Sequence, residues 1–228
     1  GGRFYPEGHT LHNVESVEIK FMTAKEEDIL TSQSLLKKGI AIDRLLQSVI
    51  IDKKIKVQDL LIGDKNALLI AARVTGYGGE YNASIRCPSC GSTEEHDFDL
   101  ESLNSLSGED PDEYGATVTE NGTFIATLPK TGLNVEVRFL NGSDEKYVAQ
   151  QTKMNKKNNL SDSPLSTQLR RMIVAVNGSR DGASINNLVN NMPAFDSRYL
   201  RGLYSKLSPN VDMNFNFECS TCGHEQTM

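Results

Sequence analysis

The chain has no tryptophan and only four histidines and four cysteines among its 228 residues, and its aromatic content is 7%. No apolar run approaches the roughly 20 residues that a transmembrane helix needs, so the sequence gives no reason to expect a membrane span. Basic residues are outnumbered, because 24 Lys and Arg stand against 30 Asp and Glu, for a formal charge of -6. Nucleic-acid-binding domains usually carry clustered positive charge. The charge balance therefore makes nucleic acid an unfavoured partner.

Motifs for catalysis are also scarce. The glycine-rich stretch 75–79 is followed by Glu80 instead of the Gly-Lys-Ser/Thr of a phosphate-binding loop, so it is interpreted as a plain turn after a helix. The adjacent carboxylates Glu26 and Glu27, like Glu94 and Glu95, point in different directions on a helix or strand and are predicted to be solvated. We therefore predict no catalytic residues, no enzymatic activity and no small-molecule substrate.

Two matched cysteine pairs are the most informative feature that is present. Cys87 and Cys90 form the first pair and Cys219 and Cys222 form the second, and each pair encloses two residues and is followed by a glycine. Such a turn points two sulfurs at one place, and the glycine permits the tight backbone turn. Two turns of this kind supply the four ligands of a closed tetrahedral Zn²⁺ site. The sequence predicts one structural zinc that ties the middle of the chain to its C-terminal end.

Other interpretations of the four cysteines are disulfides, a thioredoxin-like redox pair, and two half-sites completed by other chains. A redox pair normally follows a strand and opens an apolar helix, whereas both pairs here sit in sequence typical of a hairpin. No secretory signal places the chain in an oxidising compartment. The nearest competing ligand, His224, is interpreted as a bystander because four thiolates already complete a tetrahedron. A closed site of this kind leaves no position for water or substrate, so it is expected to support folding.

The sequence also contains an apparent internal repeat. Residues 17–22 (Val-Glu-Ile-Lys-Phe-Met) reappear as residues 135–140 (Val-Glu-Val-Arg-Phe-Leu), and both alternate as a half-buried strand does. A helix start follows each block, with a capping box from Thr23 to Glu26 in the first copy and capping chemistry at residues 141–145 in the second. The two copies are therefore predicted to share a strand followed by a capped helix.

Further landmarks recur in the same order. Apolar helices are predicted at 45–52 and, by a looser match, at 170–177. Short matching runs follow at 57–61 and 185–189, and further helices are predicted at 68–77 and 197–207. Strands that lead into the cysteines are predicted at 81–86 and 211–218. The prediction is an α+β protein made of two related strand–helices–strand halves, joined by a zinc-ribbon-like site of four cysteines. The first repeat spans 1–100, an acidic connector and strand span 101–133, and the second repeat spans 134–228.

A succession of short motifs links this chain to a known family. They comprise Phe4-Tyr5-Pro6, residues 17–30, 50–52, 59–61, Gly63-Asp64, Ala72-Arg73, 75–78 and the two cysteine pairs. In this order they resemble the baseplate hub subunits and hub assembly proteins of T4-like contractile-tailed bacteriophages. The resemblance covers most of the first half well and the second half weakly. The chain stops soon after Cys222, whereas we expect family members to continue through another strand.

The resemblance implies a structural or assembly component of the tail baseplate hub, without enzymatic activity. Its partners would be other baseplate or tail hub proteins, and its location the host cytoplasm during assembly and the virion tail. Candidate anchors for such contacts are Tyr77, Tyr81, Tyr114, Phe195 and Tyr199, although helical spacing favours core packing for Phe195 and Tyr199. The alternatives are a nucleic-acid-binding zinc-ribbon module and a metal-dependent hydrolase.

Overall fold

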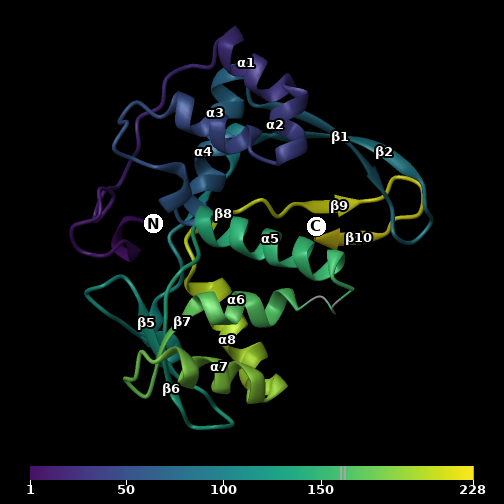
Figure 1. Cartoon of the computed structure of the whole chain (residues 1–228). Coiled ribbons are helices and arrows are strands. Elements are labelled where there is room, and N and C mark those ends of the chain that lie inside the picture. Colours follow the sequence, from purple (N-terminus) through teal and green to yellow (C-terminus); the bar gives the residue numbers. More distant parts are fainter. Residues whose placement is uncertain (160, 162, 228) are drawn as a thin grey trace. The chain divides into compact units, whose positions relative to one another are not determined.

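The computed structural model describes residues 1–159, 161 and 163–227 (Figure 1). The chain divides into two compact units, which are described separately. The sheet unit contains Gly1–Glu18, Asp52–Lys65 and Ser107–Asn210, and the cysteine unit contains Ile19–Ile51, Asn66–Leu106 and Val211–Met228. Helices occur together with antiparallel sheets, which confirms the α+β class. None of the helices in the described residues has the length and apolar character that crossing a membrane requires.

An antiparallel four-stranded sheet forms the centre of the sheet unit. Its order is β4-β5-β6-β7, with β4 at Thr117–Val118, β5 at Phe124–Thr127, β6 at Asn134–Val137 and β7 at Ile173–Val176. The alternation of β5 and β6 buries Phe124, Ala126, Val135 and Val137 on one face. This is the pattern of a sheet that covers a core on one side. A register shift at Glu136/Val137 interrupts the pairing of β6 with β7.

Helices complete the core of the sheet unit. They are α5 (Gly142–Lys157), α6 (Pro164–Met172), α7 (Gly182–Asn191) and α8 (Ala194–Leu207), with 3-10 turns η1 (Gly2–Phe4), η2 (Val57–Asp59) and η4 (Pro111–Tyr114). Both α6 and α7 contact β7 (Figure 1). The buried Asp196 in the first turn of α8 accepts hydrogen bonds from the backbone N–H groups of Lys130 (2.7 Å) and Thr131 (3.0 Å), which fixes the β5–β6 turn to α8.

The cysteine unit combines a small helical cluster with two hairpins. Helices α1 (Ala24–Thr31), α2 (Gln33–Lys38) and α3 (Ala41–Val49) contact one another, and α4 (Ile62–Tyr77) enters this unit at residue 66. The hairpins pair β1 (Glu80–Arg86) with β2 (Thr93–Asp99) and β9 (Asn216–Glu218) with β10 (Glu225–Thr227). The short elements η3 (Leu100–Ser102) and β3 (Ser105–Leu106) follow β2 along the chain, and β8 (Asn210–Val211) precedes β9.

Several element predictions are confirmed and others are wrong. The capping boxes at Thr23 and Asn141 are present, and the helices predicted at 68–77 and 197–207 exist. Residues 17–22 do not form a regular strand, because only Ile19 makes a bridge, to Ile50. The helix predicted at 170–177 is also wrong: α6 ends at Met172 and strand β7 follows. The strand predicted at 211–218 is split between β8 and β9.

Candidate metal centre and two buried carboxylates

The two cysteine turns have the same backbone geometry. In the first turn the N–H of Cys87 donates to the Ser92 carbonyl (2.8 Å) and the N–H of Gly91 donates to the Cys87 carbonyl (3.0 Å). In the second turn Cys219 donates to the His224 carbonyl (2.9 Å) and Gly223 donates to the Cys219 carbonyl (2.8 Å). Gly91 and Gly223 have φ values of 76° and 67°, a left-handed conformation that glycine adopts without steric cost. The sequence therefore positions two equivalent turns at the ends of two hairpins.

All four cysteines meet at one place. Their sulfur atoms lie within 4.8 Å of one another, with 3.8 Å between Cys87 and Cys222 and 3.7 Å between Cys90 and Cys219. A disulfide needs about 2.05 Å, and all four cysteines are free thiols here. A zinc–sulfur distance of about 2.3 Å in a tetrahedron places the sulfurs about 3.8 Å apart. The donor set and its spacing therefore fit a tetrahedral metal ion. The two turns that carry the cysteines connect β1 to β2 and β9 to β10 (Figure 1).

One cysteine of each pair is part of an apolar cluster. Cys87 and Cys219 are each 1% exposed and pack with Ile85 and Phe217, while Phe98 and Phe215 add partly buried rings. Cys90 and Cys222 are exposed. Each hairpin thus contributes one cysteine that is buried in the apolar cluster and one that is exposed.

The pKa values of the two exposed cysteines are shifted in opposite directions. The Ser92 hydroxyl lies 3.0 Å from the Cys90 sulfur, and it is the main cause that lowers the pKa of Cys90 to about 6. The backbone N–H of His224 acts to lower the pKa of Cys222, but burial and the neighbouring thiols outweigh it and raise this pKa to about 12.

Glu94 connects the first hairpin to the second cysteine turn. Its carboxylate accepts hydrogen bonds from the Ser220 backbone N–H (3.2 Å), the Thr221 hydroxyl (3.4 Å) and the Cys219 thiol (3.2 Å). The Ser220 N–H is the leading cause of a lowered pKa for Glu94. The prediction that Glu94 is solvated is therefore wrong. The period of two along β2 places Glu94 on the same half-buried face as His96 and Phe98, and this was the signal that could have identified it.

The histidines take no part in the cysteine cluster. Among the described residues, the group of close metal-ligating side chains contains the four cysteines alone. His224 contributes its backbone carbonyl to the second turn, while its ring lies 3.5 Å from the Gln226 side chain. His96 packs its ring against Phe98 and Phe215, with centroids 4.9 and 5.4 Å away.

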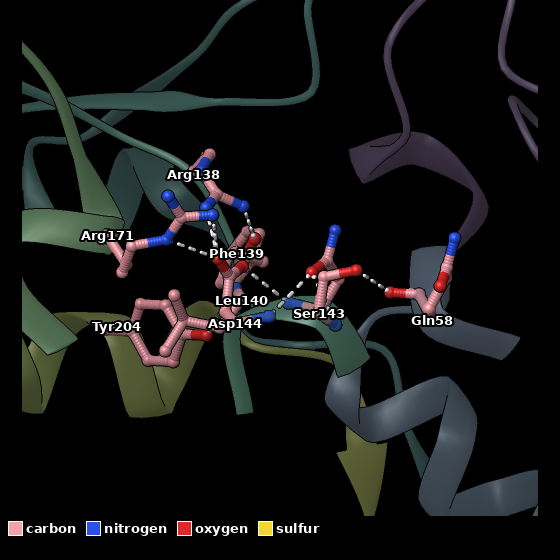
Figure 2. Close-up of polar contacts among 9 residues, drawn as sticks. Gln58, Arg138, Phe139, Leu140, Ser143, Asp144, Arg171 and Tyr204 are labelled. Atoms are coloured by element: carbon pink, nitrogen blue, oxygen red, sulfur yellow. Dashed lines mark hydrogen bonds and ion pairs between the residues drawn. The ribbon is translucent and has the colours of Figure 1, made fainter. Parts of the chain in front are cut away.

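A second polar feature is a buried carboxylate in the sheet unit (Figure 2). Asp144 is 0% exposed and lies at the third position of α5, where it accepts a hydrogen bond from the Asn141 backbone N–H (3.0 Å). Arg138 and Arg171 each donate to its Oδ1 atom at 2.7 Å. Burial alone would raise the pKa of Asp144, but the hydrogen bonds from Arg138, Asn141 and Arg171 lower it overall. The charge is therefore buried yet fully compensated.

The cysteine unit contains a similar carboxylate at Glu26. Its side chain is also 0% exposed, so the prediction that Glu26 is solvated is wrong. It lies at the third position of α1 and accepts a hydrogen bond from the Thr23 backbone N–H (3.0 Å). Lys20 donates to it at 2.8 Å and the Ser48 hydroxyl at 2.5 Å. The hydrogen bond from Lys20 is the largest cause of a lowered pKa for Glu26, and the hydrogen bond from Ser48 is the second. In both units a cation six residues earlier and a donor near the end of a following helix hold the carboxylate.

Comparison with known proteins places the chain in one family. A family model described as "T4 bacteriophage base plate protein" matches residues 7–228. No curated protein and no solved structure matches the chain. Because the family model covers nearly the whole sequence, the chain belongs to this family of base plate proteins.

Proposed function

From this family membership, we propose that the protein is a structural or assembly component of the tail baseplate hub and acts through contacts with other baseplate or tail proteins. The family match over residues 7–228 is the observation that carries the proposal. The absence of enzymatic activity belongs to the proposal as well, because four thiolates around one metal leave no open coordination position. The protein would act in the host cytoplasm during assembly, and as a structural component it would be located in the virion tail baseplate.

Deletion of the gene from the phage that encodes this chain tests this function. The expected result is a loss of complete baseplates that wild-type protein supplied from a plasmid restores. Chemical cross-linking of assembling tails, read by mass spectrometry, should connect the chain to hub proteins. Normal baseplates in the deletion strain would contradict a structural or assembly role, and cross-links confined to peripheral baseplate proteins would contradict the hub location.

The cysteine cluster supports the proposal of one structural Zn²⁺ bound by Cys87, Cys90, Cys219 and Cys222. Its support is the sulfur spacing of 3.7 and 3.8 Å, which matches a tetrahedral tetrathiolate site. Elemental analysis of purified protein should give one zinc per chain, and Cys90→Ser should reduce that content strongly. Ser89→Ala, in the same turn, serves as the control and should retain zinc. Protein that contains no zinc after purification in zinc-supplemented medium would contradict the proposal.

Two related halves, with boundaries at 1–100, 101–133 and 134–228, form the third part of the proposal. Helices α3 and α6 both have nine residues, and their last residues accept equivalent hydrogen bonds: Lys20 donates to Val49 and Arg138 to Met172, both at 2.9 Å. Ser48 and Arg171, each one residue before those acceptors, bind the buried carboxylates. An experimental structure in which residues 19–50 and 137–173 do not superpose would contradict the duplication.

The nucleic-acid alternative gains no support from the structure. The exposed face of strand β2 carries Glu95, Asp97 and Asp99, a negative surface that would repel phosphate.

A further inference from the structure

The sheet unit contains a hollow on the outer face of α8. The cavity has a volume of about 300 Å³, and its lining is predominantly apolar. Tyr114 closes it from η4, and six residues line it from α8: Phe195, Arg198, Tyr199, Gly202, Leu203 and Lys206. These α8 residues are spaced as one face of a helix, with the buried Leu203 at the floor of the hollow, whereas Leu200 and Leu207 face the core. A helix with one apolar face in the core thus presents a second apolar surface to solvent.

Phe195 shows that this surface is not completed by the protein itself. Its side chain is 61% exposed, so the prediction that Phe195 packs in the core is wrong. Tyr199, for which core packing was also expected, is half-buried and lines the same hollow. A large exposed aromatic beside an apolar hollow is characteristic of a contact surface, because aromatic anchors supply much of the binding energy in protein interfaces.

Gly202 provides an independent indication that the hollow is kept empty. Glycine is unfavourable inside a helix, and Gly202 lies well inside α8. A Cβ atom placed on Gly202 would meet no atom within 4 Å, and its φ does not lie in the left-handed range. Neither packing nor backbone conformation in the described residues therefore requires a glycine here. An occupant that enters the hollow would require a glycine here, because a side chain on residue 202 would take up the space of the occupant.

The opposite wall is held in place before any partner arrives. The Tyr114 hydroxyl donates to Glu109 and accepts from the Lys206 ammonium at 3.0 Å, and that ammonium lies 4.1 Å from the centre of the Tyr114 ring. Glu109 is also ion-paired to Lys206 at 3.8 Å. Such a preorganised wall reduces the conformational cost of binding.

The charge around the hollow indicates the chemistry of the occupant. The charged residues that line it, Arg198 and Lys206, are both cationic, although the whole chain has a formal charge of -6. Lys206 already has Glu109 as a partner, but Arg198 is exposed and makes no ion pair or hydrogen bond within the described ranges. A guanidinium without a partner next to an apolar hollow is suited to a carboxylate that neighbours an apolar side chain.

We infer that this face of α8 binds a short acidic segment of another tail protein, which inserts an aliphatic or aromatic side chain over Gly202 and pairs a carboxylate with Arg198. This inference rests on the proposed function, since it supplies a surface for the contacts that a baseplate component makes. The positive and apolar face of α8, on an otherwise acidic protein, would thus bind a partner of complementary charge.

A peptide-binding experiment tests the inference. Overlapping synthetic peptides that cover the other tail proteins of the phage are the probe, and the full chain is the analyte. Bound peptides should contain Asp or Glu beside Leu, Phe or Met. Gly202→Leu, which fills the hollow, and Arg198→Glu, which reverses its charge, should each weaken binding at least about tenfold.

Matched controls separate loss of the site from loss of the fold. Gly182→Leu places the same side chain on another helix of the sheet unit, at a position where a Cβ also meets no atom within 4 Å. Arg201→Glu makes the same charge reversal on α8 at an exposed position that does not line the hollow. Both controls should bind peptides as the wild type does, and circular dichroism should show that all four variants are folded. Unchanged binding by Gly202→Leu or Arg198→Glu, binding of peptides without carboxylates, or no binding at all would overturn the inference.

Two further measurements distinguish this inference from the wider proposal and from self-association. In the deletion strain, wild-type protein should restore baseplates and Gly202→Leu should not. Full restoration by Gly202→Leu would overturn the α8 surface and leave the structural role intact, whereas baseplates that form without any copy of the protein would overturn the structural role itself. A wild-type dimer in size-exclusion chromatography that Gly202→Leu abolishes would assign the surface to a second copy of the chain and would also overturn the inference.

Discussion

The sheet unit and the cysteine unit each bury one helix-capping carboxylate, but they compensate its charge with different partners. Asp144 receives two guanidinium groups, from Arg138 and Arg171, whereas Glu26 receives one ammonium and two hydroxyl groups. A buried charge is tolerated only when it is paired or well hydrogen-bonded. The comparison shows that cations and neutral donors can meet the same requirement at the same helical position.

The residue after each cation shows a larger difference. Phe139, next to Arg138, is 3% exposed and packs among the rings of Phe4, Phe124 and Tyr204. Phe21, next to Lys20, is 74% exposed. The chain before Phe139 belongs to the four-stranded sheet, while the chain before Phe21 makes one bridge, from Ile19 to Ile50. The same local pattern therefore gives a core residue in one unit and a surface residue in the other, because the sheet is present in one only.

If the four cysteines bind zinc as proposed, removal of that ion should produce the largest difference between the two units. Structural zinc in small peptides contributes on the order of 10 kcal/mol, which is comparable with the whole stability of a domain. After chelation, or in Cys219→Ser, we expect hydrogen exchange to increase sharply in β1, β2, β9 and β10, while β5–β7 retain slow exchange. Ser89→Ala is the control. Equal loss of protection in β5–β7 would show that the two units do not unfold separately.

Truncation of Phe139 and of Phe21 should change the free energy of unfolding by very different amounts. Phe139→Ala creates a cavity among three aromatic rings and should lower the free energy of unfolding by about 3–5 kcal/mol. Phe21→Ala removes an exposed ring and should change it by less than about 0.5 kcal/mol. Urea titration of each variant measures both values. A large loss of stability in Phe21→Ala would mean that this ring is covered in solution.

Neutralising Asp144 should lower the free energy of unfolding more than neutralising Glu26. Asp144→Asn leaves two guanidiniums without their anion and should cost about 3 kcal/mol. Glu26→Gln leaves one partly exposed ammonium and hydroxyl groups that can find other partners, so we expect a smaller cost, about 1–3 kcal/mol. Glu145→Gln, one residue after Asp144, removes an exposed ion pair with Lys65 and should cost about 0–1 kcal/mol. Equal values for Asp144→Asn and Glu145→Gln would show that burial of the Asp144 pair does not matter.

Local chemistry explains which features the sequence could predict. The cysteine turns, the capping boxes and the positions of α4 and α8 depend on residues within a few positions of one another, and all were predicted. The close approach of Cys87 to Cys222 was predicted from the four ligands that a tetrahedral metal site requires, although 135 positions separate the two cysteines. Their meeting was predictable because four thiolates are needed at one point.

Long-range partners explain what the sequence could not predict. Nothing near Asp144 indicates that Arg171 will reach it, because that contact depends on how α6 packs on α5. The apolar run from Met172 to Val176 suits a helix or a buried strand equally, and pairing with β6 decided the outcome. Phe195 has helical spacing on a helix with two apolar faces, so spacing alone could not tell which face lies in the core.

Acid should weaken the sheet unit through Asp144 in a predictable direction. The pKa of Asp144 is lower in the folded protein than its value of about 3.9 in an unfolded chain. A depressed carboxylate pKa contributes stability that is present above the unfolded value and is lost as the pH falls through the folded value. Between about pH 6 and about pH 3, the free energy of unfolding should therefore fall more for the wild type than for Asp144→Asn, so that the two curves converge in acid. Urea titrations across this range measure the difference. Parallel curves would mean that the Asp144 carboxylate has the same proton affinity in the folded and unfolded states, and that its two arginines contribute nothing beyond the cost of burying it.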